Sequence, residues 1–217
     1  MTELEALKER HSVRSYQDKK IEKDKIQKLN ELIAECNSKG NLHIQLLEDA
    51  GDAFNRILNK FMGLASAPSI IACIGHNDDT LDERIGYYGQ KIVLFAQQLG
   101  LNTCWSGTYS PKKVNAEIKN GERLAIVIAL GYGTNNGSPR RSKSPEQVVR
   151  GGIHNKPEWF INGVNAALLA PTAINQQKFE IVLNDDGSTE IIDKNGILGK
   201  IDKGIVKYNF EVGASNN

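Results

Sequence analysis

The spacing of apolar and polar positions along the chain predicts most of its regular structure. Apolar residues recur every three or four positions over residues 2–9, 26–36 and 82–99, a spacing that predicts amphipathic helices. The helix over 82–99 is apolar around most of its circumference, so we expect it to be buried. The other helical patterns are shorter or less regular: 52–65, 112–120, a short one that begins at Ser144-Pro145, 157–170 and the ambiguous stretch 199–212.

Five segments have the patterns of β-strands. Residues 42–46 alternate apolar and polar side chains, which indicates a half-buried strand, whereas 69–74 and 124–130 are continuously apolar and indicate buried strands. Residues 179–183 and 189–193 flank an N-D-D-G turn and predict a hairpin. Because helices and strands do not alternate strictly, the predicted fold class is α+β.

Composition narrows the function classes. The 217 residues are 40% hydrophobic and 24% charged with a formal net charge of +1, so no global charge favours nucleic acid or an acidic membrane surface. Cys36, Cys73 and Cys104 are widely spaced and odd in number, which argues against a disulfide framework or a zinc site. The chain shows no signal-peptide pattern and no apolar run of the roughly 18 residues that a membrane span needs. We therefore expect a soluble cytoplasmic protein with a single domain over residues 1–217.

Residues 10–14, with the sequence R-H-S-V-R, carry the clearest chemistry. In an extended segment alternate side chains point to one side, so Arg10, Ser12 and Arg14 are expected to converge. Two guanidinium groups and a hydroxyl suit a phosphate dianion, because arginine binds phosphate oxygens bidentately. A solvated basic turn is the structural alternative.

Three further segments have side chains that suit a ligand. Residues 100–107 (G-L-N-T-C-W-S-G) leave the 82–99 helix as an apolar turn of small residues, with Trp105 as a wall for a planar ligand. Residues 140–143 (R-R-S-K) are a second basic cluster in a long surface loop. Residues 170–177 (A-P-T-A-I-N-Q-Q) offer a hydroxyl and three amides, which suit a heterocycle. Each segment equally fits an ordinary loop.

A G-Y-G run at residues 131–133 follows an apolar strand. It is not a dinucleotide-binding fingerprint, because such a site needs a helix that opens directly from the turn, and residues 134–141 contain a proline and turn formers instead.

Together the four segments resemble those of the FMN-dependent nitroreductases, and the resemblance covers most of the chain. It implies a central mixed or antiparallel sheet flanked by helices, with FMN as the cofactor. The side chains implied to hold the FMN phosphate are Arg10, Ser12, Arg14, Arg141 and Lys143, with His11 in the same segment. Those implied to lie along the flavin ring are Trp105, Ser106 and Gly107 on one side and Pro171, Thr172 and Asn175 on the other.

The activity implied by the resemblance is that of an NAD(P)H oxidoreductase. Hydride would pass from NADH or NADPH to flavin N5 and then, in a ping-pong cycle, to a small oxidant such as a nitroaromatic or a quinone. The flavin carries this chemistry, so no side chain is expected to be catalytic. Two other functions stay open: a flavin-binding redox sensor or carrier without turnover, and a phosphate-binding interaction module that uses only the two basic clusters. No nucleic acid, membrane or metal is expected as a partner.

The order of the segments departs from the usual family pattern. In the family, the P-[ST]-x-x-N-x-Q segment comes early and reaches the flavin of the opposite subunit in a homodimer, but here it spans residues 171–177. Residues 67–69 (A-P-S) and 170–172 (A-P-T) also lie about half a chain apart, each followed by an apolar strand. This order suggests a pseudo-two-fold repeat of intertwined halves, about 1–144 and 145–217, in which one chain imitates the dimer. A monomer is therefore expected, with a homodimer as the alternative.

Overall fold

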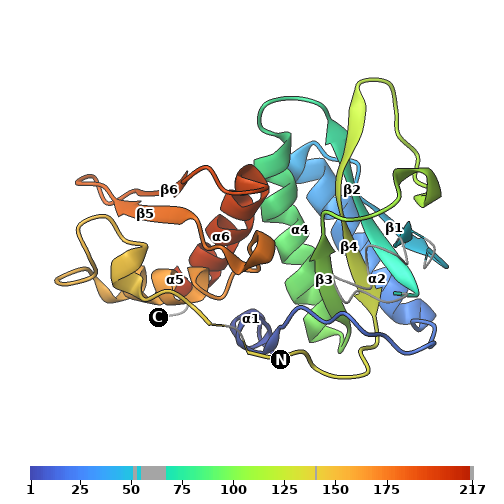
Figure 1. The fold of residues 1–217 in the computed structure, drawn as a ribbon, viewed down its shortest axis with the longest axis horizontal. Coiled ribbons are helices and arrows are strands. Elements are labelled where there is room, and N and C mark those ends of the chain that lie inside the picture. The colour runs from blue at the N-terminus through green and yellow to red at the C-terminus, as the bar shows by residue number, and fades with distance from the viewer. Residues whose placement is uncertain (51–52, 55–66, 140, 216–217) are drawn as a thin grey trace. The chain divides into compact units, whose positions relative to one another are not determined.

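A computed structural model describes residues 1–50, 53–54, 67–139 and 141–215 (Figure 1). The chain forms two compact units. The first, here called the sheet unit, comprises residues 10–81 and 92–139, and the second, the helical unit, comprises residues 1–9, 82–91 and 140–217. The expected single domain with halves near 1–144 and 145–217 stays a prediction.

The sheet unit is built on a four-stranded antiparallel sheet with the order β1-β2-β4-β3 (Figure 1). Its strands are β1 (Gln45–Glu48), β2 (Ser69–His76), β3 (Asn102–Ser106) and β4 (Glu122–Gly131). The two central strands, β2 and β4, are the continuously apolar segments of the sequence. Their apolar character follows from burial on both faces of the sheet.

One face of this sheet carries an apolar cluster, to which β2 contributes every second residue as a pleated strand must. The buried members of this cluster are Val13, Tyr16, Ala53, Phe54, Ala67, Ile70, Ala72, Ile74, Cys104, Val114, Val127 and Ala129. The Tyr16 hydroxyl donates to the carbonyl oxygen of Val13 over 2.8 Å, and burial raises the pKa of Tyr16. The cluster thus anchors the chain directly after the R-H-S-V-R segment.

Two helices of the sheet unit follow the predicted patterns. Helix α2 (Lys23–Gly40) ends at Asn41, whose backbone is left-handed with φ 48°. The side chain of Asn37 donates to the carbonyl oxygen of Ile44 over 2.9 Å and accepts from its N–H over 2.7 Å, which fastens the end of α2 to the chain entering β1. Helix α4 (Leu81–Gln98) ends before Gly100, which adopts a left-handed conformation with φ 75°.

Among the described residues, the helical unit contains residues 82–91 of α4, three further α-helices, two 3-10 helices and a β-hairpin. Its elements are α1 (Glu3–Glu9), η3 (Pro145–Gln147), α5 (Glu158–Ala167), η4 (Ala173–Asn175), β5 (Phe179–Leu183), β6 (Thr189–Asp193) and α6 (Gly199–Ala214). Helices α4 and α6 approach closely at two glycines: a Cβ added to Gly86 would lie 2.1 Å from the carbonyl oxygen of Ile201, and one added to Gly204 would lie 2.1 Å from that of Glu83. The ambiguous pattern over 199–212 is therefore a helix that is buried over much of its surface.

Two predicted elements are wrong. Residues 100–107 are not simply a turn, because Asn102 to Ser106 pair with β4 as strand β3. The helix predicted over 112–120 is reduced to the 3-10 helix η2 (Pro111–Lys113). The amide of Gln45 binds both backbone groups of Glu117, at 2.7 Å and 3.0 Å, and holds residues beyond η2 in a non-helical course.

Other predicted elements have different bounds in the structure or lie outside the described residues. The strand expected over 42–46 begins at Gln45, with Leu42 in an isolated bridge to Gly75. The helix expected over 52–65 lies, apart from residues 53 and 54, outside the described residues. Strand β2 begins directly at Ser69, whereas η4 separates Thr172 from β5, so the two segments thought to repeat differ locally. The internal repeat stays a prediction. None of the helices described is long and apolar enough to cross a membrane.

Candidate functional site

In the sheet unit, the R-H-S-V-R segment lies alongside strand β3. Ser12 forms a parallel β-bridge with Thr103, and the N–H of Val13 donates to the carbonyl oxygen of Thr103 over 3.0 Å. The extended conformation assumed for residues 10–14 is thus present at this bridge. Two segments that the sequence analysis selected separately are brought side by side.

The polar side chains of residues 10–14 gather near Cys104 of β3. Burial raises the pKa of the Cys104 thiol, and the charges of Arg14 and Arg10 together with a hydrogen bond from Ser12 oppose this rise. Arg10 is only 4% exposed, whereas Arg14 is exposed. The charges of both arginines and the Ser12 side chain thus act on the same thiol, and the predicted convergence of the three side chains on a ligand stays a prediction.

The other predicted residues of this unit follow Cys104. Trp105 is half-buried and pairs with Ile128 in the sheet, so its side chain lies on the face opposite to that of Cys104. The Ser106 hydroxyl donates to the carbonyl oxygen of Thr108 over 2.9 Å, which shapes the turn after β3. Gly107 is exposed.

The G-Y-G run after β4 packs on the R-H-S-V-R segment. The N–H of Gly133 donates to the Asn102 side chain over 2.8 Å, and a Cβ at Gly133 would lie 2.8 Å from Val13. A Cβ at Gly137 would lie 2.6 Å from the Cβ of His11. These glycines allow the loop to cover the segment closely, which gives the run a packing role.

In the helical unit, residues 171–177 form a strained turn. Pro171 and Thr172 are buried, and three residues that are not glycine have positive φ: Ile174 at 45°, Asn175 at 55° and Gln177 at 45°. Side chains with a Cβ rarely adopt this conformation, and a cluster of such residues persists only where the surroundings hold it.

The buried side chain of Gln177 fastens this turn to the second basic cluster. Its Nε2 donates to the carbonyl oxygen of Leu168 over 2.9 Å, and its Oε1 accepts from the N–H of Lys143 over 2.7 Å. The Nζ of Lys143 donates to the carbonyl oxygen of Gln177 over 2.6 Å, and the Nδ2 of Asn175 donates to that of Arg141 over 2.8 Å. Arg141 and Lys143 are therefore brought to the same turn as Thr172 and Asn175.

The side-chain oxygen of Asn175 is a candidate ligand contact. Within the described part of the chain, this buried Oδ1 atom accepts no hydrogen bond. A buried acceptor without a donor is costly, so it suits a bound molecule that carries an N–H group.

The sequence analysis missed Asp202, which supports the same turn. This residue lies in the first turn of α6, is 7% exposed and accepts hydrogen bonds from the N–H of Ala173 and the Nε2 of Gln176. Burial raises its pKa to about 6; the two hydrogen bonds act against the rise, and the charge of Asp193 adds to it. No spacing in the sequence marks Asp202, because its burial follows from the packing of α6.

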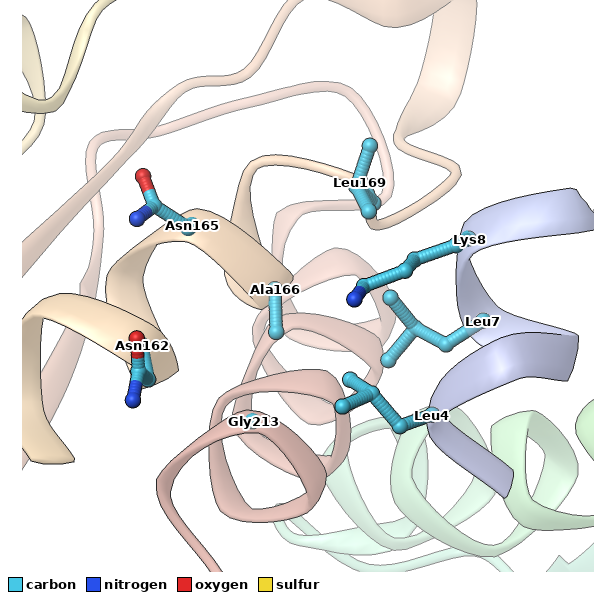
Figure 2. Close-up of a pocket in the computed structure, with 8 residues that line it drawn as sticks. All are labelled: Leu4, Leu7, Lys8, Asn162, Asn165, Ala166, Leu169 and Gly213. Atoms are coloured by element: carbon cyan, nitrogen blue, oxygen red, sulfur yellow. The ribbon is translucent and has the colours of Figure 1, made fainter. Parts of the chain in front are cut away.

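A pocket of about 340 Å³ lies elsewhere in the helical unit (Figure 2). It is lined by Leu4, Leu7, Lys8, Asn162, Asn165, Ala166, Leu169 and Gly213. Figure 2 shows Lys8 extending from α1 toward the α5 side of this pocket. None of the predicted site residues lines it, so this pocket and the predicted chemistry do not coincide.

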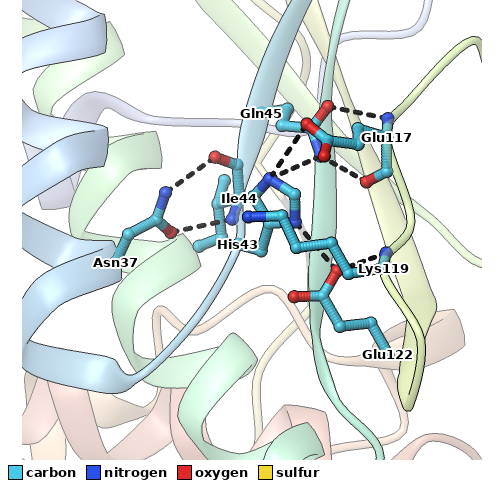
Figure 3. Close-up of polar contacts among 7 residues, drawn as sticks. All are labelled: Asn37, His43, Ile44, Gln45, Glu117, Lys119 and Glu122. Atoms are coloured by element: carbon cyan, nitrogen blue, oxygen red, sulfur yellow. Dashed lines mark hydrogen bonds and ion pairs between the residues drawn. The ribbon is translucent and has the colours of Figure 1, made fainter.

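A second polar cluster, on the sheet unit, centres on His43 (Figure 3). The Nδ1 of His43 lies 2.8 Å from the Oε2 of Glu122, and the same oxygen accepts from the N–H of Lys119 over 2.8 Å. The Nε2 of Gln45 lies 3.3 Å from the other ring nitrogen of His43. The cluster ties the start of β1 to the start of β4, and no group of three or more metal-binding side chains occurs among the described residues.

Several solved structures share this fold. A protein described as a putative nitroreductase from Thermotoga maritima has a TM-score of 0.73 at 22% identity, over 97% of this chain and 82% of that one. A nitroreductase family protein from Streptococcus pneumoniae has a TM-score of 0.54 at 17% identity, over 69% of this chain and 99% of that one. One described as a putative NADH oxidase from Clostridium acetobutylicum has a TM-score of 0.51 at 24% identity, over 70% and 99%. The chain therefore has a nitroreductase fold, which confirms the predicted fold class.

The sequence also matches the family described as "Putative TM nitroreductase" over residues 3–214. Because the match spans nearly the whole chain, the chain belongs to this nitroreductase family, and the predicted family is confirmed. It is accordingly an oxidoreductase of the nitroreductase type. No curated protein matches the chain.

Proposed function

We propose that the chain binds FMN and oxidises NADH or NADPH with a small oxidant, such as a nitroaromatic or a quinone, as the acceptor. The observation that carries this proposal is the β-bridge between Ser12 and Thr103. This bridge places residues 10–14, whose side chains suit a phosphate, beside β3, the strand that contains Trp105. Two guanidinium groups and a hydroxyl in that segment suit the phosphate of FMN.

The arginines are assigned to the phosphate end of FMN. Arg10 and Arg14 supply charge-assisted donors that a phosphate dianion requires, and Ser12 and His11 add neutral donors from the same segment. Arg141 and Lys143 are proposed as further cations for the phosphate. The Lys143 ammonium also binds the Gln177 carbonyl, so it contributes to the turn as well.

The flavin ring is assigned to two sets of residues. The first set is Trp105, Ser106 and Gly107. Trp105 supplies an aromatic surface, and the small residues Ser106 and Gly107 let the backbone approach the ring. Pro171, Thr172 and Asn175 supply the second set. The unfilled acceptor of Asn175 suits the imide N–H of a flavin, which lies between two carbonyl groups.

FMN, when bound, supplies the two-electron redox chemistry between the nicotinamide and the oxidant. The side chains named above bind and orient it, and none is proposed as a catalytic acid or base. The Clostridium acetobutylicum neighbour is described as a putative NADH oxidase, which supports NADH as a donor.

We further propose a cytoplasmic monomer that holds its flavin within one chain. The late position of the P-T-x-x-N segment supports the monomer, and three buried cysteines without a disulfide suit a reducing compartment. Sedimentation of the protein with FMN tests the first point: the expected species has the mass of one chain with one flavin, and an obligate dimer contradicts it.

A comparison of FMN with riboflavin tests the binding proposal. The apoprotein is titrated with each flavin, and quenching of flavin fluorescence is followed. We expect saturable binding of one FMN per chain, at least about tenfold tighter than that of riboflavin, which lacks the phosphate. Equal affinities would refute the phosphate assignment, and no saturable binding of either flavin would refute the proposed function.

A further inference from the structure

Asp202 of α6 holds both ends of the η4 turn. Its two carboxylate oxygens accept from the N–H of Ala173 over 3.0 Å and 3.1 Å, and Oδ2 also accepts from the Nε2 of Gln176 over 3.1 Å. Ala173 and Gln176 flank Ile174 and Asn175, the first two residues of this turn that have left-handed backbone. One carboxylate therefore closes the turn from outside.

The orientation of the Gln176 amide requires an acceptor at this point. Its Nε2 donates to the carbonyl oxygen of Ile197 over 2.8 Å, and its Oε1 accepts from the N–H of Ile197 over 3.2 Å. With the amide fixed in this way, Nε2 faces Asp202 as a donor. The N–H of Ala173 is a second donor, so residue 202 must present acceptors to both, which an ionised carboxylate does.

We propose that Asp202 is the positioning residue that keeps residues 172–177 in the conformation that presents Asn175 to the cofactor. The proposal rests on the proposed function where it concerns Asn175. Left-handed backbone at Ile174 and Asn175 is unfavourable in isolation, so the turn persists because outside contacts hold it. Asp202 supplies those contacts at Ala173 and Gln176, and Asn175 completes the turn by donating to Arg141.

Protonation of Asp202 weakens this hold. A carboxylic acid keeps one acceptor oxygen but turns the other into a donor, which then faces the N–H groups of Ala173 and Gln176. The charged neighbour that acts on Asp202 is Asp193 at the end of β6, whose carboxylate packs against Gly199, the first residue of α6. Lys203, on the same helix, is paired with Glu83 at 2.8 Å. Local opening of the turn breaks the two hydrogen bonds that lower the pKa of Asp202 while the residue stays in the buried part of α6, so its pKa rises further above about 6 on opening. Protonation just below neutral pH therefore favours opening.

The test measures amide hydrogen exchange of residues 172–177 in protein without added flavin, from pH 5 to 8, after correction for intrinsic exchange. In the wild type, protection of the Ala173 amide is expected to fall on the order of tenfold as the pH drops through the pKa of Asp202. Asp202→Asn is expected to have low protection at every pH. The matched variant Asp193→Asn keeps the protection and moves its midpoint to lower pH, because it removes the negative charge that raises the pKa of Asp202.

FMN titration of the same proteins separates this proposal from the proposed function. Asp202→Asn is expected to bind FMN on the order of tenfold more weakly than the wild type at pH 7.5, whereas Asp193→Asn binds normally. If the wild type binds no FMN, the proposed function is wrong, but the exchange data still test whether Asp202 holds residues 172–177 in place. Protection that is independent of pH in the wild type, or unchanged in Asp202→Asn, overturns the proposal. If Asp202→Asn does not fold, the wild-type profile and its displacement in Asp193→Asn decide.

Discussion

The ammonium group of Lys143 donates to the backbone carbonyl of Gln177 over 2.6 Å, while the side chain of Gln177 accepts from the backbone N–H of Lys143 over 2.7 Å. This reciprocal pair joins two loops that are more than thirty residues apart in the sequence. The second basic cluster and the P-T-x-x-N segment are thus one structural element, and a change in one is expected to affect the other.

Loss of the Gln177 side chain should destabilise this element. Gln177→Leu removes an acceptor for the half-buried Lys143 and a donor for the buried Leu168 carbonyl, so we expect the free energy of unfolding to fall by about 1–3 kcal/mol. Urea unfolding measures this, with Lys178→Met at the adjacent exposed position as the control. A loss no larger than that of the control contradicts the assigned role.

The two arginines of the R-H-S-V-R segment should make the protein bind FMN more tightly than riboflavin, which lacks the phosphate. Arg10→Ala combined with Arg14→Ala is expected to weaken FMN binding by about 3 kcal/mol, or roughly a hundredfold, and to leave riboflavin binding almost unchanged. Arg123→Ala, which removes an arginine from β4 of the same unit, controls for general charge effects. A double variant that retains stoichiometric FMN shows that the phosphate binds elsewhere.

Asn175 allows its side chain to be tested apart from its backbone. Asn175→Gly keeps the left-handed conformation accessible, because glycine adopts positive φ without strain, but removes the amide. We expect FMN affinity to fall by about tenfold with a change in unfolding free energy of less than about 1 kcal/mol. Fluorescence titration and urea unfolding measure the two quantities, and unaltered FMN affinity would show that the buried oxygen does not meet the flavin.

The His43 cluster predicts a dependence of stability on acid. Burial tends to raise the pKa of Glu122, but hydrogen bonds from His43 and from the backbone of Lys119 outweigh it, so the pKa lies below its usual value. Because the folded-state pKa is depressed, the stability from ionised Glu122 is present above its unfolded value of about 4.5 and is lost as the pH falls through the folded-state value.

Glu122→Gln should therefore flatten the fall of unfolding free energy below about pH 4.5 and cost about 1 kcal/mol at pH 7. Chemical denaturation at several pH values measures both effects. The exposed Glu48→Gln, on β1, is the control, and a profile for Glu122→Gln that parallels the wild type is the contrary result.

Sequence patterns predicted the elements that local spacing determines. Helix α4 was recognised by the helical period of its apolar positions, and strands β2 and β4 by their short, continuous apolar runs. Strand β3 was missed because its residues N-T-C-W-S form a strand only through pairing with β4. The helix expected over 112–120 fails for the same reason, since Gln45, far away in the sequence, binds the backbone of Glu117. Contacts between distant segments decided both cases.

The candidate site shows the same division. The alternation in residues 10–14 predicted an extended segment, which the bridge of Ser12 to Thr103 shows. Lys143 lies against the turn that contains Asn175 because it is hydrogen-bonded to Gln177. The spacing of residues in the sequence does not predict these hydrogen bonds. Asp202 was missed because a single carboxylate on a helix ordinarily indicates a solvated face, and only the packing of α6 shows that it is buried.

The most direct test of the central claim is the absorbance spectrum of the protein loaded with FMN, recorded anaerobically before and after addition of NADH or NADPH. The account predicts a bound flavin spectrum that bleaches with the nicotinamide and returns when a nitroaromatic or a quinone is added. A bound flavin that neither nicotinamide bleaches would indicate a sensor or carrier, and protein that takes up no FMN would contradict the account altogether.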